Sequence, residues 1–175
     1  SRQPVREAFI KLAEQGLLTI RPQRGSVVGA IDYDAVLDAR FLREAIEADI
    51  VKLAAAAADP GLVAELRGVI ARQRAAGAER SVEFIHLDDD FHRALAEGAG
   101  KGRAWKLVEG LKAQMDRVRF LALRTFPTDK LIRQHAEIVD AVESGDATGA
   151  ERAVRRHLRE ILNDLPTIRR ENPAV

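Results

Sequence analysis

From Asp32 onward the sequence contains amphipathic helical segments and no strand pattern. Apolar residues recur at intervals of three and four, and the segments are separated by Pro60, Gly77, a glycine-rich stretch at 98–102, Pro127 and Ser144–Gly145. We expect six helices, at about 33–58, 60–76, 79–98, 102–126, 128–144 and 146–165, and a frayed tail after them. Amphipathic helices joined by short links predict a mainly α fold, an antiparallel bundle of six to seven helices.

The first 31 residues have a different pattern. The stretch SRQPVREAFIKLAEQG predicts a helix with Ser1 as N-cap, Pro4 in the first turn and Gly16 at its end. Two short β-type runs, 18–21 and 26–30, flank a turn at Pro22–Gly25 and predict a hairpin. A helix followed by a hairpin is the second half of a winged helix-turn-helix, here its recognition helix and wing. We therefore expect a chain truncated at its N-terminus, with a partial DNA-binding domain at 1–31 and a helical domain at 32–175.

Composition restricts the classes of function. Hydrophobic residues make up 46% of the chain and charged residues 31%, and there is no cysteine, so disulfides and thiolate chemistry are excluded. No apolar run approaches the roughly 18 residues of a spanning helix, so we expect a cytoplasmic protein with no membrane partner. The net charge is only +1, but residues 1–24 carry five Lys/Arg and two Glu. A basic N-terminal piece thus precedes a slightly acidic body.

The stretch LDDDFHRAL, residues 87–95, places polar groups on an apolar helix face. Asp88 lies four residues after Phe84 and three before Phe91, and His92 lies four after Asp88. Both therefore point into the core, one turn apart, where two side chains can share one ligand. His86 falls on the opposite face and should be exposed.

Two later histidines also occupy apolar stripes. His135 lies between Leu131 and Ile138, and His157 lies between Val154 and Ile161. A lone inward histidine is usually a core residue with a hydrogen-bond partner, and an Asp–His pair is often a buried hydrogen-bonded pair. Burying four such groups separately would cost about 1–3 kcal/mol for each one left unsatisfied, whereas one divalent cation satisfies all of them.

An aspartate with three neutral imidazoles suits a divalent transition ion such as zinc or nickel. One carboxylate leaves a net charge of +1 at such a site, which a small carboxylate ligand would neutralise. Arg43 and Arg119 border apolar stripes and are candidates for holding that effector. The alternative is that both are surface arginines whose stems snorkel.

These residues resemble a known family. SRQPVREAFIKLAEQGLLTIRPQRGSVV resembles the end of the DNA-binding domain of the GntR family of bacterial repressors, and LDDDFHRAL with two later histidines 22 residues apart resembles the FCD ligand-binding domain of its FadR subfamily. The resemblance implies one metal ion per chain, held by Asp88, His92, His135 and His157. It also implies DNA contacts from Arg2, Gln3, Arg6, Arg24 and Gly25. Gln3 stands where the family commonly has Thr, and Lys101 stands near a common Asn.

The resemblance implies a transcriptional regulator that is not an enzyme, so no catalytic residues are expected. It would bind operator DNA as a homodimer and sense a small carboxylic acid. One alternative is a metal-dependent hydrolase, against which we find no HExxH motif and no inward acidic residue near the cluster that could act as a base. Another is a metal-free regulator that binds acyl groups, whose apolar pocket would not need three inward histidines.

Overall fold

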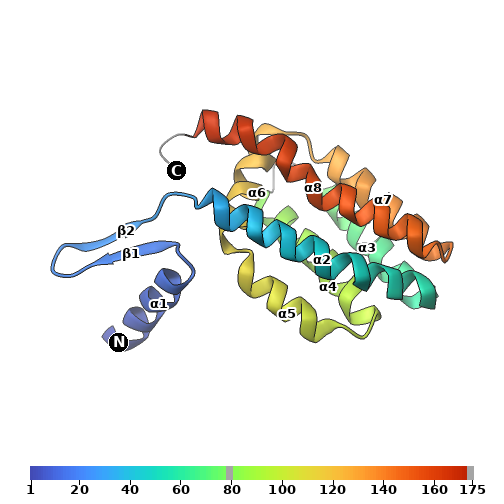
Figure 1. The fold of residues 1–175 in the computed structure, drawn as a ribbon, viewed down its shortest axis with the longest axis horizontal. Coiled ribbons are helices and arrows are strands. Elements are labelled where there is room, and N and C mark those ends of the chain that lie inside the picture. Colours follow the sequence, from blue (N-terminus) through green and yellow to red (C-terminus); the bar gives the residue numbers. More distant parts are fainter. Residues whose placement is uncertain (78–80, 173–175) are drawn as a thin grey trace.

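The computed structural model describes residues 1–77 and 81–172 (Figure 1). The chain begins with a helix and a two-stranded sheet, and seven further helices follow within the described residues. The elements are α1 (Arg2–Glu14), β1 (Leu18–Arg21), β2 (Gly25–Val28), α2 (Tyr33–Ala57), α3 (Pro60–Ala76), α4 (Ser81–Gly98), α5 (Gly102–Leu111), α6 (Ala113–Thr125), α7 (Asp129–Glu143) and α8 (Ala147–Glu171). The expected mainly α fold, a helical bundle preceded by a helix and a hairpin, is confirmed.

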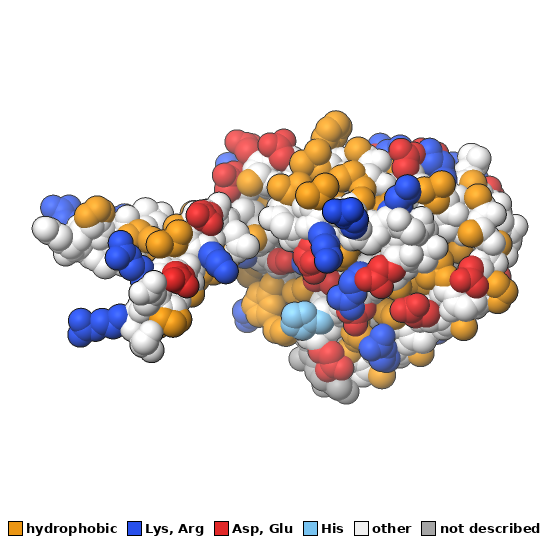
Figure 2. Space-filling model, turned by 90° about the horizontal axis from the view of Figure 1, so that it is seen from below, with side chains coloured by type: hydrophobic (Ala, Val, Ile, Leu, Met, Phe, Trp, Pro, Cys, Tyr) orange, Lys and Arg blue, Asp and Glu red, His pale blue; other side chains and the backbone are white. Residues whose placement is uncertain are grey.

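The N-terminal helix and hairpin project from one end of the bundle (Figures 1 and 2). Strands β1 and β2 are antiparallel, with Leu18 opposite Val28 and Arg21 opposite Gly25. Gly25 has φ +86°, a left-handed conformation that glycine adopts without strain. Strand β2 runs from Gly25 to Val28, so it begins and ends earlier than the predicted run 26–30. No residue of α1 is buried, although its sequence is amphipathic.

The long helices α2 and α8 lie side by side and form one wall of the bundle (Figure 1). Helix α7 packs on α8 and also on α3, which packs on α4, so the chain closes around a common core. Asp32 caps α2 by accepting from the Ala35 N–H at 3.0 Å. The larger part of the core surrounds α4 and includes Phe84, Phe91 and Trp105, all fully buried. The histidines of the sequence motif lie within this part.

A single helix predicted at 102–126 is wrong, because the structure breaks it into α5 and α6 at Lys112. Lys112 is only 5% exposed, and its Nζ lies 2.7 Å from carboxylate oxygens of both Asp89 and Asp116. These ion pairs fix the lysine at the junction. Lys112 and Asp89 lie 23 positions apart in the sequence, so local periodicity does not predict their ion pair.

The C-terminal helix was also predicted too short. Instead of fraying after residue 165, α8 continues through Pro166 to Glu171. Proline removes one helical hydrogen bond, but Ile168 is completely buried in a second apolar cluster with Ile31, Val36 and Val118. Burial of this side chain stabilises the last turns. The last three residues of the chain lie outside the described ranges.

No helix among the described residues is both long and apolar enough to cross a membrane.

Candidate metal centre and ligand cavity

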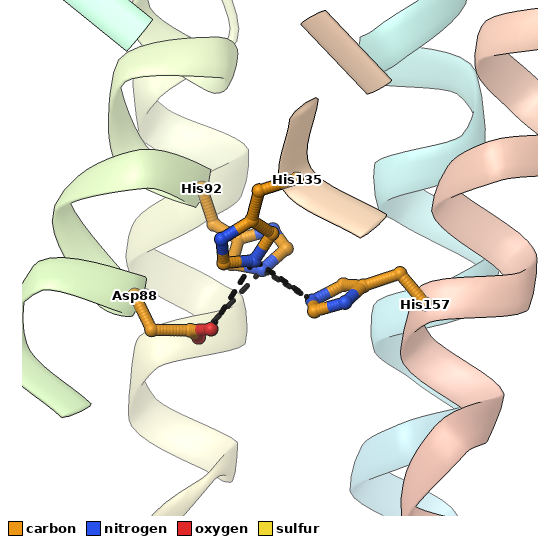
Figure 3. A group of neighbouring side chains, drawn as sticks. All are labelled: Asp88, His92, His135 and His157. Carbon is orange, nitrogen blue, oxygen red and sulfur yellow. Dashed lines mark hydrogen bonds and ion pairs between the residues drawn. The ribbon is translucent and has the colours of Figure 1, made fainter. Parts of the chain in front are cut away.

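Four buried side chains converge in the bundle, as the helical faces predicted (Figure 3). Asp88 and His92 come from successive turns of α4, His135 from α7 and His157 from α8. One ligand atom from each lies within 4.8 Å of all the others. His86, on the same helix as His92, is exposed as expected. The pattern that placed three histidines inside and one outside is therefore confirmed.

The spacing of these atoms suits a single ion bound by all four side chains. His157 Nε2 lies 3.2 Å from the Nε2 atoms of both His92 and His135. Asp88 Oδ1 lies 3.3 Å from His135 Nε2, and Asp88 Oδ2 lies 3.7 Å from His92 Nε2. Ligands bound to zinc at about 2.0–2.1 Å in a tetrahedron stand roughly 3.3 Å apart. The donor set and its dimensions both fit a divalent transition ion.

The opposite nitrogen of each imidazole faces an acceptor. Gln73 Oε1 lies 2.9 Å from His135 Nδ1, and Gln134 Oε1 lies 3.1 Å from His157 Nδ1. The side-chain amide of Gln134 cannot be flipped without losing a hydrogen bond, because its Nε2 donates to Glu160 at 2.9 Å. An amide oxygen only accepts, so each Nδ1 carries the proton and each Nε2 presents a lone pair. Acceptors of this kind orient metal-binding histidines.

His92 has a carboxylate partner instead of an amide. Its Nδ1 lies 2.6 Å from Glu47 Oε2, and Arg43 Nε donates to the other Glu47 oxygen at 2.7 Å. Burial opposes ionisation of Glu47, but Arg43 and His92 outweigh it and lower its pKa to about 2. Glu47 is thus an inward acid near the cluster that the sequence did not reveal. Glu47 contacts the imidazole from its Nδ1 side, whereas the ligand atoms gather at Nε2.

Electrostatics favour the metal-binding protonation state of Asp88, His135 and His157. Burial, reinforced by the neighbouring imidazoles, holds the pKa of His157 well below its usual value, and burial likewise lowers the pKa of His135. Burial opposes the charge on Asp88, but Arg119, which pairs with its Oδ2, keeps the pKa of Asp88 well below its usual value. The imidazoles of His135 and His157 are thus held neutral and the carboxylate of Asp88 ionised, as metal binding requires.

A cavity of about 70 Å³ adjoins this cluster. Asp88 and His157 line it directly, and the two predicted effector residues, Arg43 and Arg119, are on its wall. Arg119 is committed to Asp88, Asp89 and Asp116. Arg43 is 3% exposed, and no acceptor within the described ranges meets its Nη2. Both N–H groups of this buried Nη2 are therefore available to a ligand.

The predicted DNA-contacting residues are all exposed and lie on the projecting arm. Arg2, Gln3 and Arg6 line a shallow hollow on α1, and Arg24 and Gly25 lie at the tip of the hairpin. Figure 2 shows Lys and Arg side chains spread over this arm. The structure brings none of these residues near the metal cluster.

Several residues around the site were missed in the sequence. Gln73 and Gln134 are buried polar residues on α3 and α7, and Glu47 is 4% exposed on α2. A signal was present for Gln73, because it follows Leu66, Val69 and Ile70 on one helical stripe. Glu47 follows Arg43 by four residues, one helical turn. An ion pair between the two side chains could therefore have been inferred from their spacing.

The FCD domain family matches residues 38–160, which lie within the expected helical domain. The HTH-type transcriptional repressor RspR of Escherichia coli K12 is 42% identical over 174 residues, covering 98% of this chain and 76% of that protein. A regulator from an unstable DNA locus of Streptomyces ambofaciens is 40% identical and covers 100% of this chain and 74% of that protein. The structure of E. coli McbR/YncC superimposes with a TM-score of 0.78 at 18% identity, covering 98% of this chain and 81% of that one, which shows a shared fold.

A helical bundle with this match, preceded by a basic helix and hairpin, defines the class as a transcriptional regulator. The chain belongs to the GntR-family regulators that carry an FCD domain. Because the family and these relatives are regulators, the expectation that the chain is not an enzyme is confirmed.

Proposed function

We propose that this protein is a metal-containing repressor that binds operator DNA as a homodimer and responds to a small carboxylic acid. The observation that carries the proposal is the convergence of three imidazole Nε2 atoms and one carboxylate beside a cavity with an unpartnered guanidinium N–H. The similar protein RspR is named a transcriptional repressor, which supports repression, as opposed to activation, of transcription.

Asp88, His92, His135 and His157 would hold one divalent ion per chain, zinc or nickel. Bound there, the ion would supply a positive charge at the cavity, and an ion that takes more than four ligands would have a position for the effector. Arg119 keeps Asp88 ionised and holds its Oδ2, which leaves Oδ1 towards His135. Glu47, Gln73 and Gln134 keep the imidazoles in the tautomer that binds metal.

The effector would be an anion because it would meet the bound ion and the unpartnered Nη2 group of Arg43 at the inner end of the cavity. Arg43 offers its unpartnered Nη2, and Arg119 contributes charge already balanced by three carboxylates. A carboxylate in the cavity would satisfy Arg43 and complete the coordination of the ion. We therefore assign Arg43 and Arg119 to effector binding, with Arg43 the direct contact.

DNA binding is assigned to the projecting arm, residues 1–31, as part of a winged helix. Arg2, Gln3 and Arg6 share the exposed side of α1, and Arg24 with Gly25 forms the wing tip. Arginines at the start of a recognition helix reach guanine edges or phosphates. A two-fold symmetric dimer would match a palindromic operator.

The metal assignment is tested by elemental analysis of protein purified without chelator. We expect about one zinc or nickel per chain, unchanged in His86→Ala and much reduced in His135→Ala. His86→Ala is the matched control because it removes an exposed imidazole from α4. Protein that holds no metal and takes up neither ion would disprove the assignment.

Effector binding is tested by thermal shift with small carboxylates. A ligand that binds the folded state raises the melting temperature by mass action, so the shift should be larger for metal-loaded protein than for chelated protein. Equal shifts in the two forms would contradict coordination of the carboxylate by the ion.

The DNA assignment is tested by mobility shift of the full-length protein on palindromic DNA. Arg6→Ala should weaken specific binding by about 1–3 kcal/mol if Arg6 reads a base edge. If it binds only phosphate, affinity should fall equally on all sequences and the salt dependence should become shallower. A full-length protein that ignores such DNA at every salt concentration and ligand state would refute the repressor proposal.

A further inference from the structure

One face of α8 leads from the metal cluster along the cavity. His157, Ile161 and Asp164 are spaced by four and three residues, and all three line the cavity. Residues seven apart on a helix share a face and lie about 10 Å apart along its axis. Asp164 therefore marks the end of the cavity remote from the cluster.

An outer hollow of about 410 Å³ adjoins the cavity. The two share the wall residues Ala122, Leu123, Leu131, Glu160 and Asp164. Asp164 thus stands at the passage between the inner cavity and the outer hollow. A ligand bound at the cluster that extends towards the outer hollow would lie beside Asp164.

The two carboxylates at this passage differ in their partners. Glu160 accepts from Lys130 at 2.5 Å, Gln134 at 2.9 Å and Asn163 at 3.2 Å. Asp164 has no hydrogen bond or ion pair with any part of the chain that the structure describes. Burial and the neighbouring Glu160 raise the pKa of Asp164, and Lys130, which pairs with Glu160, offsets them only in part. A cationic group in direct contact with Asp164 would compensate its charge further.

The rest of the cavity wall is mainly apolar, and its other polar residues, Arg40 and Glu160, already have ion-pair partners. Leu123, Leu131 and Ile161 lie on it, together with Ala122 and Leu158. Such a wall favours methylene groups and offers no partner to a row of hydroxyls, each of which would lose its hydrogen bonds to water. The inner end offers Arg43 Nη2, which is buried and unpartnered.

We propose that the effector is an ω-amino acid, with its carboxylate at Arg43 and the metal cluster, a methylene spacer along the apolar wall, and its ammonium group at Asp164. This inference rests on the proposed function, since it names the class of the carboxylic acid sensed at that site. It adds Asp164 as the residue that determines specificity.

The test is calorimetric titration of zinc-loaded full-length protein with 5-aminopentanoate and with pentanoate, which differ only in the amine. The amino compound should bind about tenfold more tightly, as expected for a partly shielded ion pair. Asp164→Asn should abolish the difference and leave the affinity for pentanoate unchanged or higher. Glu171→Gln, which removes an exposed carboxylate from the same helix, should keep it.

The outcomes separate the two proposals. If both compounds bind equally well, the inference is overturned while carboxylate sensing stands. If neither binds protein shown to contain zinc, both fail. Gluconate binding more tightly than 5-aminopentanoate would also overturn the inference, because it would place hydroxyls along the apolar wall.

A length series keeps the test decisive if Asp164→Asn does not fold. In the unmodified protein, 3-aminopropanoate is too short to reach Asp164 from the cluster and should gain little over propanoate. A gain as large as that of the longer pair would show that the amine is recognised elsewhere, and the assignment of Asp164 would fall.

Discussion

Gln73 is a residue whose role depends on whether metal is bound. It is fully buried on α3, its oxygen faces His135 Nδ1 at 2.9 Å, and its own Nε2 has no partner among the described residues. In the metal-free protein, His135 can instead carry its proton on Nε2 and donate to Asp88, 3.3 Å away. Gln73 therefore selects the tautomer that binds metal.

Replacing Gln73 by methionine, which has a similar volume, should weaken zinc binding about tenfold. Without the amide oxygen, His135 would favour the tautomer with its proton on Nε2, and that proton must leave Nε2 before the nitrogen can bind zinc. The stability of metal-free protein should change by less than about 1 kcal/mol, since the unpartnered Nε2 is removed along with the acceptor. Competition with a chelating dye and urea unfolding measure the two quantities. A variant that loses stability but keeps its zinc affinity would show that Gln73 is merely structural.

Glu44 should make stability depend on pH. It is 5% exposed on α2 and accepts from Arg155 at 3.1 Å and Arg159 at 2.9 Å on α8. Hydrogen bonds from Arg159 outweigh burial and lower its pKa from 4.5 to about 2. A lowered pKa in the folded state contributes stability above pH 4.5, and this contribution is lost as the pH falls towards 2.

Glu44→Gln should therefore destabilise metal-free protein by about 1–2 kcal/mol at pH 6, a value that allows for solvent around the arginines. The difference from the unmodified protein should shrink as the pH falls from 5 to 3. Urea unfolding at each pH measures it. A difference that stays constant over this range would contradict the pKa assignment.

At the scale of residues, helical periodicity predicted all four members of the cluster and the exposure of His86. It succeeded because a polar side chain on a strongly apolar stripe is unusual whatever the neighbouring helices do. The partners Glu47 and Gln134 were not predicted. Their roles depend on which helices pack together, and one sequence without its fold does not give that pairing.

Among the elements, α6 contacts both the metal cluster and the N-terminal arm. Arg119 on this helix pairs with Asp88. On the same helix Gln114 Nε2 donates to Gly16 O at 3.0 Å and Gln114 Oε1 accepts from Asp32 N at 3.3 Å, while Arg117 donates to Gly29 O at 2.8 Å. A shift of Arg119 on effector binding would therefore move the points that hold the arm.

A double change, Gln114→Ala with Arg117→Ala, should leave metal content unchanged and reduce the effect of the effector on DNA affinity. Exchange of the Asp32 amide hydrogen should become faster, because its acceptor is removed. Mobility shift and hydrogen exchange measure the two effects. Arg124→Ala, an exposed position on α6, is the control, and a double variant with the full effector response would exclude this helix as the link.

The elements that the sequence misjudged were decided by tertiary contacts. The break between α5 and α6 is held by Lys112 between Asp89 and Asp116, and α8 continues past Pro166 because Ile168 is buried. Helices bounded by a local signal, such as the Asp59–Pro60 start of α3, were placed correctly. Local chemistry thus set most boundaries, and packing set the exceptions.

For the whole molecule, the metal would act as a cross-link within the bundle. Its ligands come from α4, α7 and α8, and Glu47 adds α2 through His92. Helices α2 and α4 are far in sequence from the consecutive helices α7 and α8, and all four contribute residues to the larger core. The projecting arm contributes no ligand to the cluster, so its local stability should not depend on the ion.

Removing the metal should therefore lower the melting temperature of the bundle. An ion present at about 1,000 times its dissociation constant stabilises the folded state by about 4 kcal/mol, which corresponds to roughly 8–16 °C for a domain of this size. Differential scanning calorimetry of zinc-loaded and chelated protein measures the shift. Hydrogen exchange should become faster in α4, α7 and α8 and stay nearly unchanged in β1 and β2.

Two variants serve as controls for this prediction. His157→Ala should melt at the same temperature with zinc and with chelator, and His86→Ala should behave like the unmodified protein. Equal melting temperatures for the loaded and chelated unmodified protein would rule out a structural role for the ion.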